Sequence, residues 1–154
     1  MILSFNPSDA FEATLAVDYT RQRNALNLGR AEAPLLQVNL LGGVKVLQPA
    51  PTGEWDFESA TSFKGNEGQS LDHAGVALTL GWQVSEAWRF KSITAYRDLD
   101  LDNYVDIDAS RWELGDVFVG VDQNQFSQEF QLLFDGGGPL TAVVGAYYMS
   151  EEIT

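Results

Sequence analysis

The chain has 154 residues, 45% of them hydrophobic, so the length suits one domain and the composition excludes an intrinsically disordered chain. Nine basic residues against 22 acidic ones give a formal net charge of −13 at pH 7, which argues against nucleic acid as a partner because phosphate binding needs a basic surface. There is no cysteine for a disulfide or a thiolate metal site, and no apolar run of about 18 residues predicts a transmembrane helix.

The first predicted strand lies near residues 10–20 and follows turn-forming residues at 6–9, Asn-Pro-Ser-Asp. Every second residue is apolar, and the residues between are small or polar. The apolar series is Phe11, Ala13, Leu15, Val17 and Tyr19, with a ring at each end. Since side chains on a strand alternate between faces, the pattern predicts one apolar and one polar face.

Residues 21–72 show no sustained period and contain prolines and glycines that predict a long loop. Such a loop is unusual in a compact soluble domain but ordinary on the outer side of a membrane barrel. Within it, Trp55–Glu58 is a candidate short strand. The apolar pieces 35–41 and 44–47 are expected to pack over another part of the molecule.

Two further strands, near 73–83 and 88–99, are predicted to form a hairpin around a tight turn at 84–87. Their apolar face carries Ala74, Val76, Leu78, Leu80 and Trp82, then Trp88, Phe90, Ser92, Thr94 and Tyr96. Trp88 to Tyr96 spans nine residues, and a tilted strand needs about 9–11 to cross a bilayer. Rings at both ends of an apolar stripe are typical of membrane-spanning barrels.

Aspartates at 98, 100 and 102 continue the face that carried Tyr96. Carboxylates facing lipid cost about a few kcal/mol each, so we expect the strand to leave the bilayer after Tyr96 and a loop to span 99–121; a bulge that flips the register is the alternative. The spacing begins like a calcium loop, but Asn103 replaces the required glycine and Ala109 the required glutamate. It therefore favours a solvated loop base.

The last strands are predicted near 122–134 and 140–150, around a turn at 135–139. Gln128 is the one misfit on an apolar face of phenylalanines and leucine. Five strands with alternating long and short connections predict an all-β, antiparallel, up-and-down transmembrane β-barrel segment with long outer loops. Five strands cannot close, and open edges cannot persist in lipid. We therefore expect an incomplete barrel, a piece of a longer protein whose export signal lies upstream.

Several runs resemble the barrel of TonB-dependent outer-membrane receptors: residues 71–82, 91–98, 102–106, 122–132 and 144–148. The Thr-Ala-Tyr-Arg run at 94–97 and the Gln-Phe-Ser-Gln-Glu run at 125–129 are the most specific in order and spacing. The resemblance is strongest over 71–152 and weaker over 11–23.

The resemblance implies that residues 1–154 are part of a plugged, 22-stranded receptor barrel in the outer membrane of a Gram-negative bacterium. Such receptors import ferric siderophores, cobalamin or oligosaccharides. The implied partners are outer-membrane lipid, the remaining barrel and plug, the TonB energising complex and a small nutrient ligand. Plug and energising segment are both absent from the sequence, so no ligand-contacting residue carries over by position.

No catalytic, cofactor-binding or metal-ligating set is predicted, and the chain is not expected to be an enzyme. His73, the only histidine, lacks a second imidazole or thiolate for a metal site, and it is expected to be a polar residue at a loop end. Rings and a cation in the outer loops are the candidate ligand contacts: Trp55, Phe57, Arg111 and Trp112. Ordinary loop packing is the competing explanation for each.

A soluble, secreted β-sandwich that binds glycans through exposed rings is the alternative, since sandwich strands also alternate apolar and polar residues. Sandwich faces pack on each other and need no ring at each stripe end. The stripes here end at Tyr19, Trp82, Trp88, Tyr96 and Tyr148, which favours the membrane. An eight-stranded ligand-carrying barrel or small barrel enzyme needs more strands than the pattern provides.

Overall fold

The computed structural model describes residues 1–52, 59–64 and 68–154, and the regular elements of these residues are all strands. The strands are β1 (Ile2–Ser8), β2 (Phe11–Ala25), β3 (Leu35–Val38), β4 (Val44–Gln48), β5 (Gly68–Gln83), β6 (Trp88–Asp106), β7 (Asp116–Asp135) and β8 (Thr141–Ile153). No helix in the described ranges has the length and hydropathy needed to cross a membrane.

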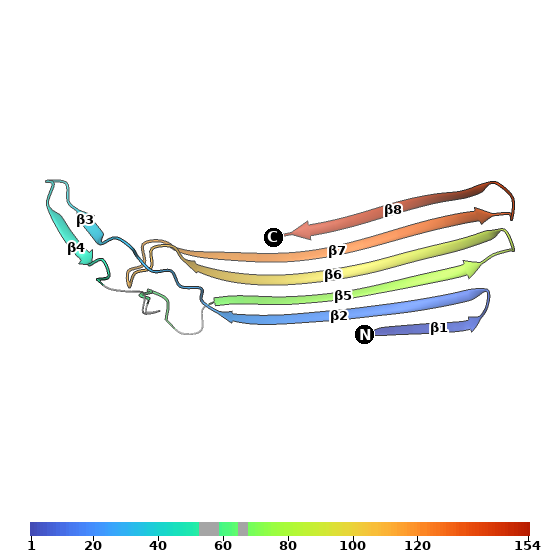
Figure 1. Ribbon diagram of the computed structural model, residues 1–154, viewed down its shortest axis with the longest axis horizontal. Coiled ribbons are helices and arrows are strands. Elements are labelled where there is room, and N and C mark those ends of the chain that lie inside the picture. Colours follow the sequence, from blue (N-terminus) through green and yellow to red (C-terminus); the bar gives the residue numbers. More distant parts are fainter. Residues whose placement is uncertain (53–58, 65–67) are drawn as a thin grey trace. The chain divides into compact units, whose positions relative to one another are not determined.

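Six strands form one sheet in the order β1-β2-β5-β6-β7-β8, and β3 and β4 form a separate two-stranded sheet (Figure 1). The all-β, antiparallel prediction is confirmed, while the six-stranded sheet is not closed into a barrel. The described chain divides into two compact units. Unit 1 comprises Met1–Gln22, Leu71–Leu101 and Val121–Thr154; unit 2 comprises Arg23–Ser70 and Asp102–Gly120.

The sheet has six strands and not five, because the residues before Phe11 form the edge strand β1. Its register pairs Leu3 with Leu15 and Phe5 with Ala13, and it shifts between Phe5 and Ser8. Pro7 lies in this irregular stretch. Proline lacks the N–H that a ladder requires and is tolerated on edge strands and at bulges, so turn-forming residues here do not stop the strand.

The predicted loop 21–72 is wrong in extent. Strand β2 continues to Ala25, β5 begins at Gly68, and the apolar pieces between them pair as the hairpin β3–β4. Asn39 Oδ1 accepts hydrogen bonds from the backbone N–H groups of Leu41 (3.0 Å) and Gly43 (2.8 Å), which stabilises the hairpin turn. The strand predicted at Trp55–Glu58 lies outside the described residues.

The predicted loop 99–121 is also too long, since β6 continues to Asp106 and β7 begins at Asp116. The connection is 107–115, closed by a hydrogen bond from Ile107 N to Gly115 O at 3.2 Å. The aspartates at 98, 100 and 102 therefore belong to β6. Charge on one face shows where an apolar band ends, but it does not interrupt a backbone ladder.

Short turns join β1 to β2, β5 to β6 and β7 to β8, and they lie together at one end of the sheet (Figure 1). The turns predicted at 84–87 and 135–139 are confirmed. In the second, Asp135 Oδ1 accepts a bond from Gly137 N at 3.0 Å, and Gly137 has φ of 72°, a conformation that favours glycine. The connections at the other ends of these strands are the longer ones.

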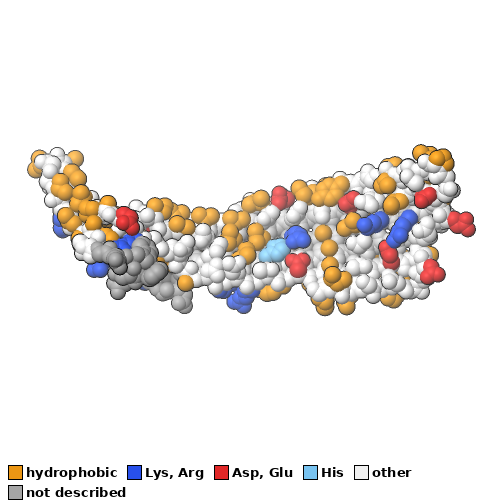
Figure 2. Space-filling view, viewed as in Figure 1, with side chains coloured by type: hydrophobic (Ala, Val, Ile, Leu, Met, Phe, Trp, Pro, Cys, Tyr) orange, Lys and Arg blue, Asp and Glu red, His pale blue; other side chains and the backbone are white. Residues whose placement is uncertain are grey.

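Unit 1 has no apolar core among its described residues. The only buried hydrophobic residue of the described chain is Ala109 in unit 2, whereas Leu78, Phe130 and Val144 of unit 1 are 37%, 45% and 70% exposed. Figure 2 shows hydrophobic side chains at the molecular surface together with a scatter of charged ones. A second sheet packed on the first would bury these side chains, and the described part of unit 1 contains only one sheet.

Candidate functional site

The apolar face of unit 1 is one continuous surface across neighbouring strands. Hydrogen-bond register places Leu132 opposite Val144 and Phe130 opposite Ala146 on β7 and β8, and Leu15 opposite Leu3 on β2 and β1. Ring contacts join the next pair of strands, with centroids 4.8 Å apart for Trp88 and Phe134 and 5.9 Å apart for Phe90 and Phe130. Apolar side chains therefore share one face within each of the strand pairs β1–β2, β6–β7 and β7–β8.

Charged groups begin directly beyond one end of this apolar face. Tyr19 ends the stripe of β2, and its hydroxyl donates to Asp72 Oδ1 at 2.7 Å. Arg21 Nε lies 3.9 Å from the same oxygen. A ring whose polar tip meets charge at the rim of an apolar band is the arrangement that aromatic residues adopt at a membrane–water interface.

The three polar residues on the apolar face are hydrogen-bonded to one another. Thr94 Oγ1 donates to Gln128 Oε1 at 2.6 Å, and Gln128 Nε2 donates to Ser92 Oγ at 3.0 Å. Ser92 is only 8% exposed. The polar residues that interrupt the apolar pattern therefore form hydrogen bonds between β6 and β7. These bonds lower the free-energy cost of placing polar groups in an apolar environment.

The opposite face of unit 1 holds ion pairs that pass over glycines. Arg89 of β6 bonds Glu12 of β2, although β5 lies between these strands. A Cβ at Gly81 of β5 would stand 2.7 Å from Glu12 Oε1, and one at Gly75 would stand 2.6 Å from Asp18 Oδ1. The small residues of β5 thus leave room for long charged side chains from its neighbours.

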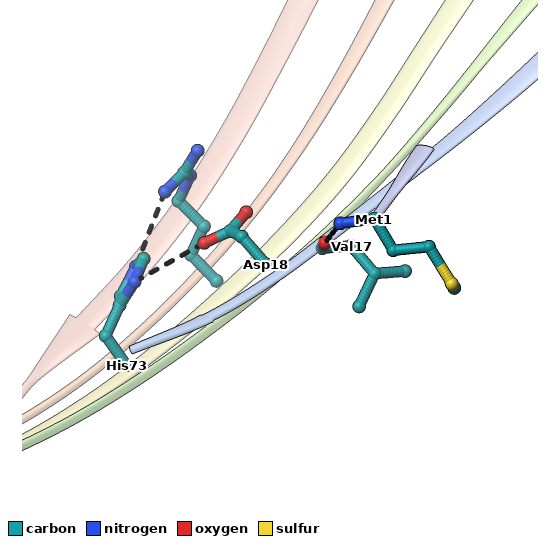
Figure 3. Close-up of polar contacts among 5 residues, drawn as sticks. Met1, Val17, Asp18 and His73 are labelled. Atoms are coloured by element: carbon teal, nitrogen blue, oxygen red, sulfur yellow. Dashed lines mark hydrogen bonds and ion pairs between the residues drawn. The ribbon is translucent and has the colours of Figure 1, made fainter. Parts of the chain in front are cut away.

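His73 takes part in a second cross-strand group on this polar face. Its Nδ1 lies 3.6 Å from Asp18 Oδ2, and its Nε2 lies 3.4 Å from Arg97 Nη1 (Figure 3). Figure 3 also shows the Met1 amino group directed at Val17 O, which accepts its bond at 2.7 Å. His73 lies within β5, so its predicted place at a loop end is wrong. Asp18, His73 and Arg97 thus form one polar group that extends across β2, β5 and β6.

The predicted ligand contacts are only partly described. Trp55 and Phe57 lie outside the described residues. Arg111 and Trp112 lie next to each other in the connection 107–115 of unit 2, and both are exposed. Unit 2 also has a hollow of about 630 Å³, lined by Arg23, Leu28, Phe63 and their neighbours, but neither Arg111 nor Trp112 lines it.

Sequence reasoning missed an acidic cluster at the base of this connection. One oxygen from each of Asp106, Asp108 and Asp116 lies within 4.8 Å of the others, a separation at which one metal ion can touch all three. The signal was an Asp-x-Asp pair at the end of one strand and an aspartate at the start of the next. It could be used only once the strand ends were known.

The aspartates considered for calcium lie elsewhere. Asp98, Asp100 and Asp102 alternate along the extended strand β6, where neighbouring side chains on one face are separated by about 6.8 Å. A calcium loop needs its ligands turned inward around one point. The carboxylates that lie close together are instead those of Asp106, Asp108 and Asp116, which follow them in the chain.

Comparison with known proteins gives no relative for this chain: no protein-family model, no curated protein and no solved structure matches it.

Proposed function

We propose that this chain is a sector of the barrel of a TonB-dependent receptor in the outer membrane of a Gram-negative bacterium. The receptor imports a scarce nutrient: a ferric siderophore, cobalamin or an oligosaccharide. The observation that carries the membrane part is the band of large apolar side chains that remains open on one face of unit 1. The runs at 94–97 and 125–129, which resemble those receptors, support the choice of family.

The height of the band suits a bilayer. Stripes such as Phe11–Tyr19 and Trp88–Tyr96 are nine residues long, which at about 3.4 Å per residue gives about 27 Å along the strand. A strand tilt of about 40° reduces this to about 20 Å along the membrane normal, near the apolar belt of about 25 Å that outer-membrane barrels present. Lipid is therefore a suitable cover for this face.

The two sheet edges support a larger closed barrel. Strands β1 and β8 are the outer strands of the sheet, and each offers an unpaired row of backbone N–H and C=O groups. In the hydrocarbon layer, each backbone N–H or C=O group without a hydrogen-bond partner costs several kcal/mol. Further strands of the same barrel would pair with both edges, and the paired charges opposite the lipid face would then line its lumen.

The soluble sandwich has less support. It requires a second layer over the apolar face, and the described part of unit 1 contains a single sheet whose Val144 is 70% exposed. A face of this size left open to water would be an aggregation site. The glycan-binding alternative therefore has no specific observation in its favour.

Tryptophan fluorescence tests the lipid-facing side. With Trp55 and Trp112 both replaced by phenylalanine, emission comes from Trp82 and Trp88, which lie on the apolar face at its turn end. We expect phospholipid vesicles with brominated acyl chains to quench this emission about twofold, because interfacial rings contact the upper acyl chains. The matched control carries Trp82→Phe and Trp88→Phe and should escape quenching. A folded, detergent-free monomer without quenching would contradict the proposal.

Growth on limiting nutrients tests transport. The full receptor gene of which this chain is proposed to encode a sector should be required for growth on one of three supplied nutrients: a ferric siderophore as iron source, cobalamin as the required cofactor, or an oligosaccharide as carbon source. We expect that growth to need the TonB energising complex, because receptors of the family it resembles take their energy from it. The double variant Arg111→Ala/Trp112→Ala should reduce uptake of the nutrient if the connection 107–115 contacts it. Growth on none of the three, or growth independent of the energising complex, would refute the transport reading.

A further inference from the structure

Three carboxylates of unit 2 share one small volume. Asp106 is the last residue of β6, Asp108 lies in the connection 107–115, and Asp116 is the first residue of β7. Because β6 and β7 are neighbours in the sheet and Ile107 N bonds Gly115 O, the connection folds back on itself and brings these side chains together. One oxygen of each lies within 4.8 Å of the others.

Burial makes this cluster different from an ordinary acidic patch. Asp106 is only 6% exposed, and its Oδ2 is hidden from water with no hydrogen-bond partner. Both oxygens of Asp108 and Oδ1 of Asp116 are hidden and unpartnered as well. Burying an unpaired carboxylate oxygen is strongly unfavourable, so these oxygens are suited to accept a positively charged ligand.

Only two of the six carboxylate oxygens of the cluster accept a hydrogen bond from the described residues. Asp106 Oδ1 accepts a bond from Ala109 N at 2.8 Å, and Asp116 Oδ2 accepts one from Ser62 Oγ. Among the described residues, no lysine, arginine or histidine forms an ion pair with any of the three aspartates. These hydrogen bonds hold Asp106 and Asp116 in place and leave the other four carboxylate oxygens of the cluster available to a ligand.

We propose that Asp106, Asp108 and Asp116 bind a divalent cation, and that the cation is Ca²⁺. An all-oxygen donor set selects hard cations, and Ca²⁺ accepts carboxylates at about 2.3–2.6 Å in flexible geometry, so ligand oxygens up to about 4.8 Å apart suit one ion. A further hidden, unpartnered oxygen, Gln48 Oε1, is held nearby, since Gln48 Nε2 bonds Ala109 O at 3.2 Å.

Bound Ca²⁺ would hold the connection 107–115 to the strands that flank it. Two ligands come from the strand ends and one from the connection, so the ion joins both sides of the same turn. The inference concerns unit 2 alone and does not depend on the membrane role proposed for unit 1. The calcium experiments below can therefore fail while the fluorescence test succeeds, and the reverse also holds.

Calorimetric titration of CaCl₂ into the full chain tests the site directly. We expect one site with a dissociation constant of about 10⁻⁴ to 10⁻³ M, the range of extracellular calcium modules. Asp108→Asn keeps the shape and removes a ligand charge without touching the bonds from Ala109 or Ser62, and it should weaken Ca²⁺ binding at least about tenfold. The matched control is Glu113→Gln, which removes the same charge from the same connection at an exposed position and should bind as the parent does.

Trypsin provides a second measurement that does not need a variant to fold. Arg111 lies in the connection, and Lys45 lies in the β3–β4 hairpin of the same unit. With about 10 mM Ca²⁺, cleavage after Arg111 should slow about 10- to 100-fold relative to chelator, because a ligand that binds only the closed form lowers the population of the open one. Cleavage after Lys45 should not change.

Three results would overturn the proposal: no saturable Ca²⁺ binding below about 10 mM, equal binding by Asp108→Asn, or no protection at Arg111. Equal protection by Mg²⁺ would also overturn it, because a cation that merely screens the net charge of −13 would act in that way. Mg²⁺ needs near-ideal octahedral geometry and should be at least about tenfold weaker.

Discussion

Replacing Leu132 by arginine should destabilise the lipid-folded protein by about 2–4 kcal/mol, whereas the same change at the adjacent Leu133 should cost less than about 1 kcal/mol. The two leucines are neighbours on β7 and pair with Val144 and Val143, respectively. They differ in the face they occupy. On the proposed lipid face the guanidinium would enter the hydrocarbon layer, whereas on the opposite face it would join charged residues in water.

The pair is a matched comparison because both changes introduce the same side chain at nearly the same depth. Urea unfolding in phospholipid vesicles, followed by tryptophan emission, measures both free energies. In water alone, Leu132→Arg should cost little, since Leu132 is already 39% exposed in the sheet. Equal costs at both positions would mean that both faces are covered alike, and a larger cost at Leu133 would mean that the faces are assigned the wrong way round.

Alternation was enough to predict five of the six strands of the main sheet, β2, β5, β6, β7 and β8, and to divide their residues between two faces. Two of the connections between these strands, β5 to β6 and β7 to β8, are short turns that the sequence also marks, the second by the run Asp135–Pro139. The two-residue period depends only on the local backbone geometry of a strand, so it can be recognised without knowing which strands lie beside it. The edge strand β1 was missed because Pro7 stops a central strand but not an edge strand.

Strand ends could not be predicted from the same pattern. The aspartates at 98, 100 and 102 end the apolar stripe of β6, yet the backbone continues to pair as far as Asp106. A ladder depends on hydrogen bonds to the adjacent strand, which one strand's sequence does not record. The misplaced ends then concealed the carboxylate cluster, because Asp106 and Asp116 become neighbours only in the correct register.

The polar interruptions of the apolar face illustrate the same limit at a smaller scale. Along the sequence, Ser92, Thr94 and Gln128 each weaken a stripe. In the sheet, Gln128 of β7 lies beside the other two on β6 and bonds both of them. A polar residue on an apolar face is costly mainly when it lacks a hydrogen-bond partner, and the partner of Thr94 here is 34 residues away along the chain.

Gln128→Leu should therefore destabilise the protein by about 1–3 kcal/mol, although it makes the face more hydrophobic. The change removes the acceptor of the Thr94 hydroxyl and the donor to Ser92 Oγ, and it leaves both hydroxyls unsatisfied. Gln128 Nε2 also reaches Ile93 O at 3.1 Å, and this carbonyl would lose a further bond. The measurement is the same urea titration in vesicles.

The triple variant Ser92→Ala, Thr94→Val and Gln128→Leu separates lost hydrogen bonds from altered shape. When every partner of a buried polar group is replaced by an apolar group of similar size, the net cost is near zero, because no donor or acceptor is left without a partner. We therefore expect the triple variant to recover to within about 1 kcal/mol of the parent protein. If the triple variant stays as unstable as Gln128→Leu alone, the cost lies in packing, and the network does not explain how these residues are tolerated on the apolar face.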